Sequence, residues 1–514
     1  MMRIAVLTPL PPVRSGIAGY AELLLPALAR HANVVAVVDQ PSHVAPAGVE
    51  VIGIDRFRAG SDQWDAVIGQ MGNNPYHDFI WEEAVAKPMY VVLHDLVLHH
   101  LIVERTLAKD DAAGYEQLVR ASHGEPAAAF ARGRALGFHG EIGNFLFPSS
   151  SDLARRSKGV IVHNEWAGRR LREEGVESPI IVTGHPVDQS AAIPSGEERR
   201  ALRERLGVLE RERLIGIFGF VTDAKRPAAI FEAFGLARRK EPGLRLLVVG
   251  EPAPNIDLRA LAKLNGLPDG SWIATGYVAD EEFDLYLSAA DRVISLRYPS
   301  AGEMSGPLIR AFRIGRPVAV SAVAQFAELP SSVAEQIPIV ESETEALAHF
   351  MVRDFPAGLG ESQQQWLREH ASLEGTVSDY LRALRGDNDI PEIESVSGSI
   401  PLLIRFDVER FVLQASGGDV RLSIRLRSRS DTLFRAAAYG EPALRFVLKG
   451  FDEDRMVFDR WLQPRSDIAP GGAYEADVAL PESARDLRFT IEPAVEGIPP
   501  FLPATPPLVT GGEQ

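Results

Sequence analysis

Residues 298–320, "YPSAGEMSGPLIRAFRIGRPVAV", combine small, polar and helix-starting residues in one short stretch. The pattern predicts a strand that ends near Tyr298, then a turn, a helix and another strand. Ser305 or Gly306 fits the helix N-cap, and Pro307 suits the first helical position because proline has no amide proton. Small residues just before a helix leave backbone amides that a phosphate group can approach, and the helix dipole favours its charge. The stretch therefore indicates a candidate phosphate site, with an ordinary capped helix as the alternative.

A second stretch, "HDLVLHH" at residues 94–100, places three histidines and an aspartate within seven residues. These are side chains that bind metal ions, so the stretch is compatible with a metal site or with a structural role. A strand end that passes into a helix does not give the His-x-x-x-His spacing by which a helix holds zinc. The sequence therefore predicts no metal here.

The elements that must position these residues alternate between short apolar strands and helices. Near-continuous runs of Val and Ile are typical of parallel strands covered on both faces. In the first part of the chain the predicted strands are 3–8, 34–39, 49–54, 65–72, 89–95, 159–164 and 180–186. In the second part they are 214–220, 244–251, 272–278, 292–298, 317–323 and 337–342. Ligands of such sheets bind at the carboxyl ends of the strands.

The two sets of strands predict two Rossmann-like α/β domains that face each other across a cleft, at residues 1–190 and 191–385. A polar helix at 195–208 separates them, opened by a Ser-x-x-Glu cap signal at Ser195 and Glu198. The stretch 105–158 is mostly helical and would either pack beside the cleft or cover the first sheet. A helical stretch at 361–385 fits a tail helix that returns to the first domain.

Beyond the second set the pattern changes to antiparallel strands. Residues 386–399 are predicted to be a linker, because they are rich in Gly, Asp, Ser and Pro. Residues 419–430 alternate apolar and polar side chains, as do 474–480 and 487–493. This period of two predicts an antiparallel β-sandwich at 400–500, followed by a loose tail at 501–514. Trp461 within it is more typical of a core residue than of a ligand platform.

Composition limits the class of protein. The chain has 514 residues, of which 46% are hydrophobic and 24% charged, which is typical of a globular protein with two or three domains. A net charge of −16 argues against a nucleic-acid binder. The absence of cysteine excludes disulfides and thiolate sites. The first residues resemble a strand rather than a signal peptide, so we expect a cytoplasmic protein, at most peripheral at the inner face of a membrane.

Several segments together are similar to family 4 glycosyltransferases, the retaining, nucleotide-sugar-dependent enzymes with the GT-B fold. They occur in the expected order over most of residues 1–385, which makes the resemblance specific. The segments are "TPLPPVRSGIAGYAELL", "GQMGNNPYHDFIW", "YVVLHDLVLHH", "GIFGFVTDAKRPAAIFEAF", "LLVVGE", "ATGYVADEEFDLYLSAADRVISLRYPSAGEMSGPLIRAFRIGRPVAVS" and "FAELP". The resemblance implies a GT-B fold with an appended C-terminal β-domain and transfer of a sugar from a nucleotide diphosphate.

The resemblance also assigns roles to residues. Gly16 matches a loop glycine close to the donor phosphates, and His94 matches the active-site histidine that contacts the donor sugar. Lys225 matches the lysine that binds the donor diphosphate, with Arg226 beside it. Glu303 matches the first glutamate of a paired motif near the sugar hydroxyls. Three neighbouring residues would supply backbone near sugar and phosphate: Met304, Ser305 and Gly306.

Three residues of the first domain are expected to lie at the rim of the predicted cleft. Asp95 would orient the loop or His94. Asn73 and Asn74 would form a polar loop that touches the acceptor, although Asn pairs are also common in turns.

Two positions depart from the family's pattern. Many members have an arginine five residues before the phosphate lysine, and this position is Phe220. The helix commonly carries a second glutamate that holds the ribose, and the aligned residue is Arg310. A cation lost at one position and gained at another is consistent with an active subset of the family, with an altered nucleotide preference or with lost activity. The active subset is favoured, so Arg310 is counted among the donor-binding residues.

The resemblance implies a metal-independent transferase that needs no cofactor and acts on a glycan or a lipid-linked saccharide, as in bacterial-type polysaccharide synthesis. Two alternatives stay open: a nucleotide-sugar epimerase of the same fold, and a non-catalytic glycan-binding or scaffold protein. The β-domain would either hold a glycan or a partner protein near the site, or shield and stabilise the core.

Overall fold

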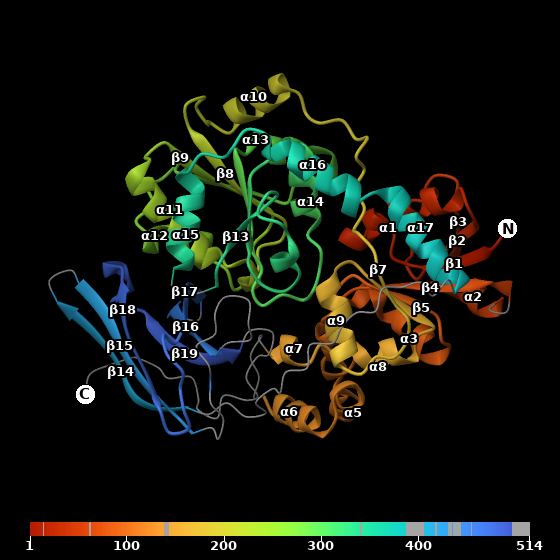
Figure 1. Ribbon diagram of the computed structural model, residues 1–514, viewed down its shortest axis with the longest axis horizontal. Helices are drawn as coiled ribbons and strands as arrows, with labels where there is room; N and C mark the ends of the chain where they lie inside the picture. Colours follow the sequence, from red (N-terminus) through yellow and green to blue (C-terminus); the bar gives the residue numbers. More distant parts are fainter. Residues whose placement is uncertain are drawn as a thin grey trace. The chain divides into compact units, whose positions relative to one another are not determined.

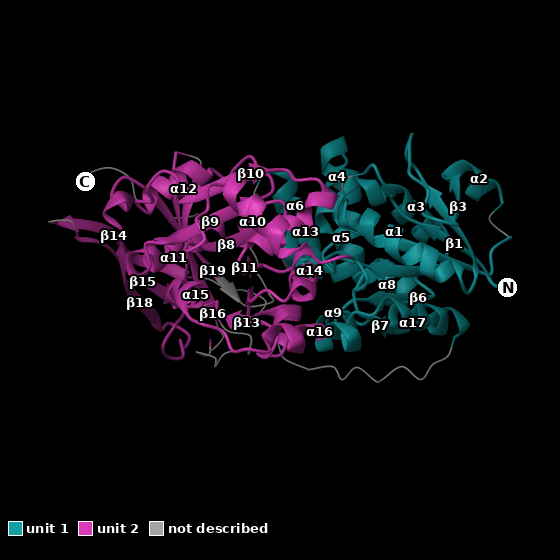
Figure 2. Cartoon of the chain, turned by 90° about the horizontal axis from the view of Figure 1, so that it is seen from above, with its two compact units in different colours: residues 1–191, 301–306, 365–398 teal, residues 192–300, 307–364, 399–514 magenta. Residues whose placement is uncertain are grey.

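The computed structural model describes residues 1–13, 15–60, 63–137, 143–339, 342–386, 406–416, 419–429, 434, 444–453 and 455–495. The predicted tail at 501–514 lies outside them, as does all of the predicted linker except Gly386. The chain divides into two compact units, coloured in Figure 2. Unit 1 comprises residues 1–191, 301–306 and 365–398, and unit 2 comprises 192–300, 307–364 and 399–514. Two short segments far along the chain therefore belong to the first unit.

Unit 1 is built on a seven-stranded parallel sheet of order β3-β2-β1-β4-β5-β6-β7. The strands are β1 Arg3–Leu7, β2 Asn33–Val38, β3 Glu50–Gly53, β4 Ala66–Met71, β5 Tyr90–Leu93, β6 Gly159–Val162 and β7 Ile180–Val182. Its helices are α1 Gly16–Ala29, α2 Ile54–Ala59, α3 Asp78–Ala86, α4 His99–Arg105, α5 Ala112–His123, α6 Glu125–Ala135, α7 Gly143–Leu146, α8 Ser151–Arg156, α9 Glu165–Glu173 and α17 Leu373–Arg385. The stretch between β5 and β6 is helical, as predicted.

The tail helix α17 packs on helix α1 of the first unit, so the helical stretch at 361–385 does return to the first domain. Its Tyr380 is fully buried, and the Tyr380 and Tyr20 hydroxyls lie 2.8 Å apart. Thr183, which follows β7, donates a hydrogen bond to Asp379 of α17 at 2.7 Å. A Cβ atom at Gly184 would lie 1.6 Å from the His370 carbonyl oxygen, so glycine is needed where α16 Leu359–His370 ends. Helix α17 is therefore part of the first unit's core.

Unit 2 begins with helix α10 Gly196–Arg205, which carries the predicted capping box between Ser195 and Glu198. Its six-stranded parallel sheet has the order β10-β9-β8-β11-β12-β13. The strands are β8 Arg213–Phe218, β9 Leu244–Val249, β10 Trp272–Gly276, β11 Arg292–Ser295, β12 Val318–Ser321 and β13 Glu335–Ile337. The helices are α11 Pro227–Lys240, α12 Leu258–Leu264, α13 Asp280–Ala289, α14 Gly306–Ile314 and α15 Glu343–Val352. The last strand lies earlier in the chain than the predicted 337–342.

The remainder of unit 2 consists of two three-stranded antiparallel sheets, in the orders β14-β15-β18 and β17-β16-β19. The strands are β14 Phe406–Ser416, β15 Asp419–Ser428, β16 Leu444–Asp452, β17 Arg455–Leu462, β18 Ala473–Leu480 and β19 Arg488–Val495. Alternate residues of β15 are buried, as the period of two predicts. Phe446 of one sheet stacks on Tyr474 of the other, with ring centroids 4.5 Å apart. The predicted antiparallel sandwich is confirmed, and we call β14–β19 the β-domain.

The β-domain shares a hydrophobic core with the second Rossmann-like domain. Strand β17 packs against α11 and α12, and one continuous apolar cluster contains residues of those helices and of both β-domain sheets. Figure 1 shows β16 and β17 beside α11, α12 and α15. The β-domain is therefore an extension of the second Rossmann-like domain. Among the described residues, no helix has the length and apolar character needed to cross a bilayer.

Candidate functional site

In each parallel sheet, the strand order reverses beside the strand that comes first in the chain. In unit 1 the switch lies between β1 and β4, and in unit 2 it lies between β8 and β11. The loops at the carboxyl ends of these strands diverge and leave room for a ligand. The loops after β1 and β4 contain Gly16 and Asn73, and the loop after β8 contains Lys225. Each unit thus has a candidate site at its switch point.

The loop after β1 leads into α1, where Gly16 is exposed at the first helical position. Ser15 caps this helix by accepting a hydrogen bond from the Ile17 amide. A Cβ atom at Gly16 would meet no atom within 4 Å, so the fold itself does not require glycine there. At Gly72, after β4, a Cβ atom would lie 2.4 Å from the Ile17 side chain. The loops after β1 and β4 therefore contact each other.

Polar residues follow the next strands at the same edge. Asp95 accepts a hydrogen bond from the Asn73 amide at 2.9 Å, and Asn73 in turn accepts one from the Leu101 amide of α4 at 3.0 Å. Asn74 caps the short 3₁₀ helix Pro75–His77. This geometry lets Asp95 and Asn73 orient the loop after β4. Whether the Asn pair also touches an acceptor stays a prediction.

His94 follows β5 and has both ring nitrogens engaged. Its Nε2 lies 2.5 Å from Gln70 Oε1, so this nitrogen donates, and its Nδ1 lies 3.2 Å from His163 Nε2. The Tyr20 ring packs edge-on against it at 4.6 Å. Burial lowers the pKa of His94 well below its usual value, and His163 acts in the same direction. His94 is therefore a neutral ring held in one orientation.

Sequence reasoning missed the three partners of this histidine: Tyr20, Gln70 and His163. Two signals were available. Gln70 is the polar residue in the otherwise apolar strand β4, and His163 follows β6 in "VIVHN" as His94 follows β5 in "VVLHD". Among the described residues, no group of three or more His, Asp or Glu side chains is arranged to hold a metal ion.

The segment that carries Glu303 is fixed to unit 1. The Leu96 amide donates to the Ala301 carbonyl at 2.7 Å, and Asn164 after β6 donates to the Gly302 carbonyl at 2.9 Å. Gly302 has a φ of 77°, and a Cβ atom there would lie 2.9 Å from both Leu96 and Trp166. Only glycine therefore fits. The structure thus places Glu303 on a loop that is bound to Leu96, the residue that follows His94 and Asp95 after β5.

Glu303 also organises its own loop, because its Oε2 accepts a hydrogen bond from the Ala301 amide at 2.9 Å. Met304 is half-buried and Ser305 is buried. Helix α14 begins at Gly306, so Ser305 is the residue immediately before it and Pro307 is its second residue. The predicted helix start is within one residue of the observed one.

In unit 2, Lys225 belongs to a short 3₁₀ turn, Asp223–Lys225, just before α11. Its side chain is buried, and Nζ donates to the Phe218 carbonyl at 2.6 Å. A Cβ atom at Gly219 would lie 2.9 Å from this nitrogen and 3.9 Å from Pro307 of α14. The ammonium group is therefore held against the end of β8, near the first turn of α14. A cation beside a helix N-terminus is suited to bind a phosphate.

The structure corrects the prediction for Arg226. Its side chain is 1% exposed, and its guanidinium pairs with the buried carboxylates of Glu343 and Asp459, so it faces the protein interior. The adjacent sequence position suggested a second phosphate cation, but the backbone of Arg226 is left-handed and its side chain turns into the protein. Arg226 is a structural residue.

The two departures from the family's pattern have different surroundings. Phe220 is exposed at the end of β8. Arg310 on α14 binds Asp284 at 2.6 Å and Asp280 at 2.5 Å, both on α13, and its guanidinium lies 4.6 Å from the centre of the Phe283 ring. The charge of Arg310 is thus balanced by carboxylates. Its role toward a donor stays a prediction.

Residues 212–353 match the family model described as "Glycosyl transferases group 1". The resemblance to glycosyltransferases is confirmed at this level, and the assignment to family 4 stays a prediction. The match covers most of the second Rossmann-like domain and includes Lys225 and Glu303, and it supports a transferase of the glycosyltransferase class. No curated protein sequence matches the chain.

Solved structures confirm the GT-B fold. Alr3699/HepE from Anabaena, in complex with UDP and glucose, is 15% identical with a TM-score of 0.54 and covers 75% of this chain and 100% of its own. Sucrose-phosphate synthase from Thermosynechococcus elongatus is 14% identical with a TM-score of 0.50, covering 75% and 99%. The catalytic domain of starch synthase IV from Arabidopsis thaliana, bound to ADP and acarbose, is 10% identical with a TM-score of 0.50, covering 75% and 99%.

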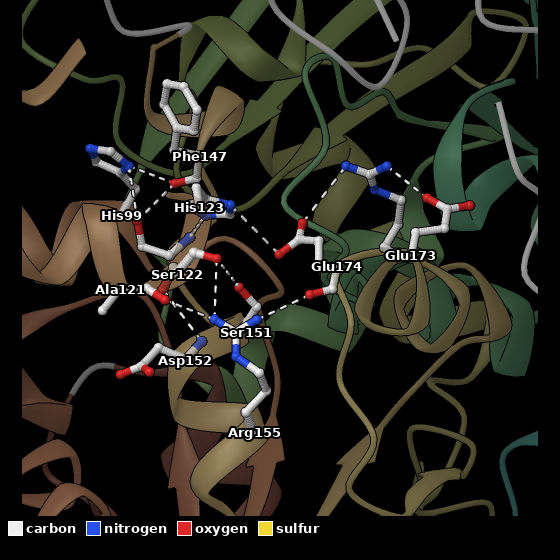
Figure 3. Close-up of polar contacts among 12 residues, drawn as sticks. His99, Ala121, Ser122, His123, Phe147, Ser151, Asp152, Arg155, Glu173 and Glu174 are labelled. Carbon is white, nitrogen blue, oxygen red and sulfur yellow. Dashed lines mark hydrogen bonds and ion pairs between the residues drawn. The ribbon is translucent and has the colours of Figure 1, made fainter. Parts of the chain in front are cut away.

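A different polar cluster holds the helices between β5 and β6 (Figure 3). His123 Nε2 accepts a hydrogen bond from the Ser149 amide at 2.9 Å, while Nδ1 lies 3.8 Å from Glu174. Arg155 donates to the carbonyls of Ala121 and Glu174 at 2.8 and 3.0 Å. These contacts satisfy helix ends with side chains. We interpret the cluster as structural.

Unit 1 is expected to lose stability in mild acid because of its buried neutral histidines. Burial lowers the pKa of His77 to about 4 and those of His99 and His163 to about 3, and it lowers the pKa of His94 well below its usual value. The unfolded chain takes up these protons near pH 6.5, whereas the folded protein does so only at lower pH. Stability is therefore fully present above about pH 7 and falls as the pH drops from about 6.5 towards 4.

When the pH falls from 7 to 5, each of these four histidines should lower the unfolding free energy by about 2 kcal/mol. The four decreases together approach the stability of a typical domain. Burial raises the pKa of Glu174, which opposes part of this loss. Urea unfolding at both pH values measures the change, and hydrogen exchange should locate it in unit 1. His31→Gln, at an exposed position, is the control and should leave the pH slope unchanged. A pH-independent unfolding free energy would contradict the assignment.

Proposed function

We propose that the protein is a retaining glycosyltransferase of family 4 that transfers a sugar from a nucleotide diphosphate to a glycan or glycolipid acceptor. The observation that carries the proposal is the position of Lys225. It lies at the strand-order switch of unit 2, beside the first turn of α14, within the segment that matches the glycosyltransferase family. The proposal places the donor diphosphate there.

Breaking the bond between the anomeric carbon and the diphosphate builds negative charge on the leaving group. In this proposal Lys225 and the backbone amides at the start of α14 stabilise that charge, without a divalent metal ion. The acceptor hydroxyl attacks from the same face of the sugar, and its proton passes to the departing phosphate. The proposal keeps Arg310 of α14 as a donor-binding residue, and to bind a phosphate its guanidinium would have to be shared with Asp280 and Asp284.

The proposal gives the sugar-facing roles to His94 and Glu303. Glu303 would bind sugar hydroxyls, and the neutral His94, whose ring nitrogens both have protein partners, would shape the sugar pocket rather than carry charge. Gly16 would leave space for the donor, and Asn73 and Asn74 would line the acceptor side. We place the reaction in polysaccharide or glycoconjugate synthesis on the cytoplasmic side of the cell, with peripheral contact to a membrane where the acceptor is lipid-linked.

Donor binding tests the proposal directly. We expect UDP, ADP, GDP or dTDP, or one of their glucose conjugates, to raise the melting temperature by several degrees at saturation, because a ligand that binds only the folded state stabilises it. UDP-glucose is the first probe, since one of the HepE structures is a complex with it. The corresponding nucleoside, which has no phosphate, is the control and should give no shift. EDTA should change neither the shift nor transfer.

The proposal fails if two results occur together. None of the nucleotides and conjugates shifts the melting temperature, and no labelled sugar is transferred from any nucleotide-sugar to a cell extract that contains acceptors. Loss of transfer with EDTA that magnesium or manganese restores would overturn the metal-independent mechanism alone.

A further inference from the structure

We propose that the β-domain positions the donor loop, residues 219–226, through Asp459 and Trp461. The inference rests on the proposed function, because it concerns the loop that carries Lys225. Asp459 and Trp461 lie on β17, far from residue 225 in the sequence, and they contact the neighbours of Lys225 rather than Lys225 itself. They are therefore positioning residues.

The end of the donor loop has an unusual backbone. Arg226 adopts φ 58° and ψ 45°, the left-handed region that non-glycine residues rarely occupy. In this conformation its amide donates to the Asp223 carbonyl at 2.8 Å, and its carbonyl accepts from the Ile230 amide in α11 at 3.1 Å. The residue thus closes the turn that contains Lys225 and opens α11. A conformation of this kind persists only when other contacts hold it.

Two buried carboxylates hold the Arg226 side chain. Glu343, the first residue of α15, accepts from Nε at 2.7 Å and from Nη2 at 2.5 Å, which is a bidentate pair. Asp459 of β17 accepts from Nη1 at 2.5 Å. The exposed fractions of the three side chains are 1%, 3% and 6%, so solvent hardly screens these ion pairs. The guanidinium orientation, and with it the Arg226 backbone, therefore depends on a residue of the β-domain.

Trp461 supports the loop from a second direction. Its ring is 2% exposed, lies 5.5 Å from the Arg226 guanidinium and packs edge-on against Tyr298 at 4.1 Å. The Tyr298 amide donates a hydrogen bond of 2.7 Å to the carbonyl of Ala224, the residue before Lys225. Trp461 thus restrains both the residue after Lys225 and the strand-end segment that binds the residue before it. Val447 of β16 belongs to the same small apolar cluster, with Val323 and Ile339.

The experiment compares two substitutions on β17 that both weaken the junction. Asp459→Asn removes the charge that holds Arg226. Arg460→Gln removes the ion pair between the next residue and Glu232 of α11, which does not involve the donor loop. We expect Asp459→Asn to weaken UDP or ADP binding by about tenfold, the scale for losing a partner that orients a ligand-binding group. Arg460→Gln should change it less than about twofold, because sites that share no partners act independently to within about that factor.

Hydrogen exchange gives a readout that needs no ligand. The amides of residues 222–228 should exchange faster in Asp459→Asn than in Arg460→Gln. Each variant is measured at the same number of degrees below its own melting temperature. Equal exchange in the two variants overturns the inference, whether or not any nucleotide binds. Faster exchange with unchanged nucleotide affinity also overturns it, because the loop would then be held for another purpose. A wild-type protein that binds no nucleotide contradicts the proposed function, while the exchange comparison still decides whether Asp459 holds the loop.

Trp461→Phe serves if Asp459→Asn does not fold. Phenylalanine keeps apolar contact with Tyr298 but loses part of the ring surface beside Arg226. Faster exchange at residues 222–228 in this variant supports the inference, and wild-type exchange there contradicts it.

Discussion

A protein that ends at Gly386 is expected to lose the folded second Rossmann-like domain, although it keeps all of the transferase-like sequence. Strand β17 covers α11 and α12, and the two parts share one apolar cluster. Deletion would leave Arg226 buried beside Glu343 without Asp459 and would remove Trp461 from Tyr298. Breaking a buried ion pair costs about 3–5 kcal/mol, and loss of a buried aromatic side chain costs a similar amount. The sum is comparable with the whole stability of a domain.

Circular dichroism, thermal melting and limited proteolysis of the truncated protein measure this effect. A chain that ends at Val495 is the matched control, because it keeps every described strand, and it should melt like the full protein. A cooperative, protease-resistant truncated protein that still binds nucleotide would contradict the shared core. The sequence leaves two roles open for the β-domain: to hold a glycan or a partner protein near the site, or to shield and stabilise the core. The result decides between them, since a domain that only holds a glycan near the site would be dispensable for folding.

Lys225→Met is expected to reduce sugar transfer at least about a hundredfold, the scale for losing one preorganised group that stabilises developing charge. Methionine keeps most of the side-chain volume, so the buried contacts near Gly219 should survive. Steady-state kinetics with the true donor measure the loss, and melting temperature reports folding. Lys240→Met, at the exposed far end of α11, is the control. Near-wild-type turnover in Lys225→Met would mean that the diphosphate binds elsewhere.

Glu303→Gln belongs to the same prediction and should give a loss of similar size. Gln is preferable to Ala because the carboxylate of Glu303 also accepts the Ala301 amide, and an amide oxygen preserves that hydrogen bond. A variant whose loop is intact but whose transfer falls separates the role of Glu303 toward the sugar from its role in the loop. Equal turnover with and without the charge would remove Glu303 from the site.

Much of the fold could be predicted from the sequence because parallel strands and sandwich strands have different periods. Runs of Val and Ile predicted the strands of both sheets, and alternation predicted β15. Strand ends were less accurate: the predicted strand 89–95 ends in the structure at Leu93. Ladder pairing stops where the neighbouring strand stops, and a local pattern does not contain that information.

The candidate site could be predicted from the sequence only in part, because a local pattern does not show which distant residues meet. His94, Lys225 and Glu303 are singled out by their resemblance to motif positions of family 4 glycosyltransferases, and their roles toward a donor stay predictions. The burial of Arg226 could not be predicted, since its partner Asp459 lies more than two hundred residues further along the chain. The attachment of residues 301–306 to unit 1 depends on hydrogen bonds from Leu96 and Asn164, which a local pattern likewise does not predict.

The position of α17 has a consequence for how the chain matures during synthesis. Its Tyr380 and its apolar residues belong to the core around α1, so the first unit is incomplete when the ribosome has passed Ala191. Translation at 5 to 20 residues per second needs roughly 10 to 40 seconds more to reach Arg385. During that time the surface of α1 that α17 will cover is exposed to solvent and to other nascent chains. The N-terminal unit should therefore depend on chaperones longer than a domain whose sequence is continuous.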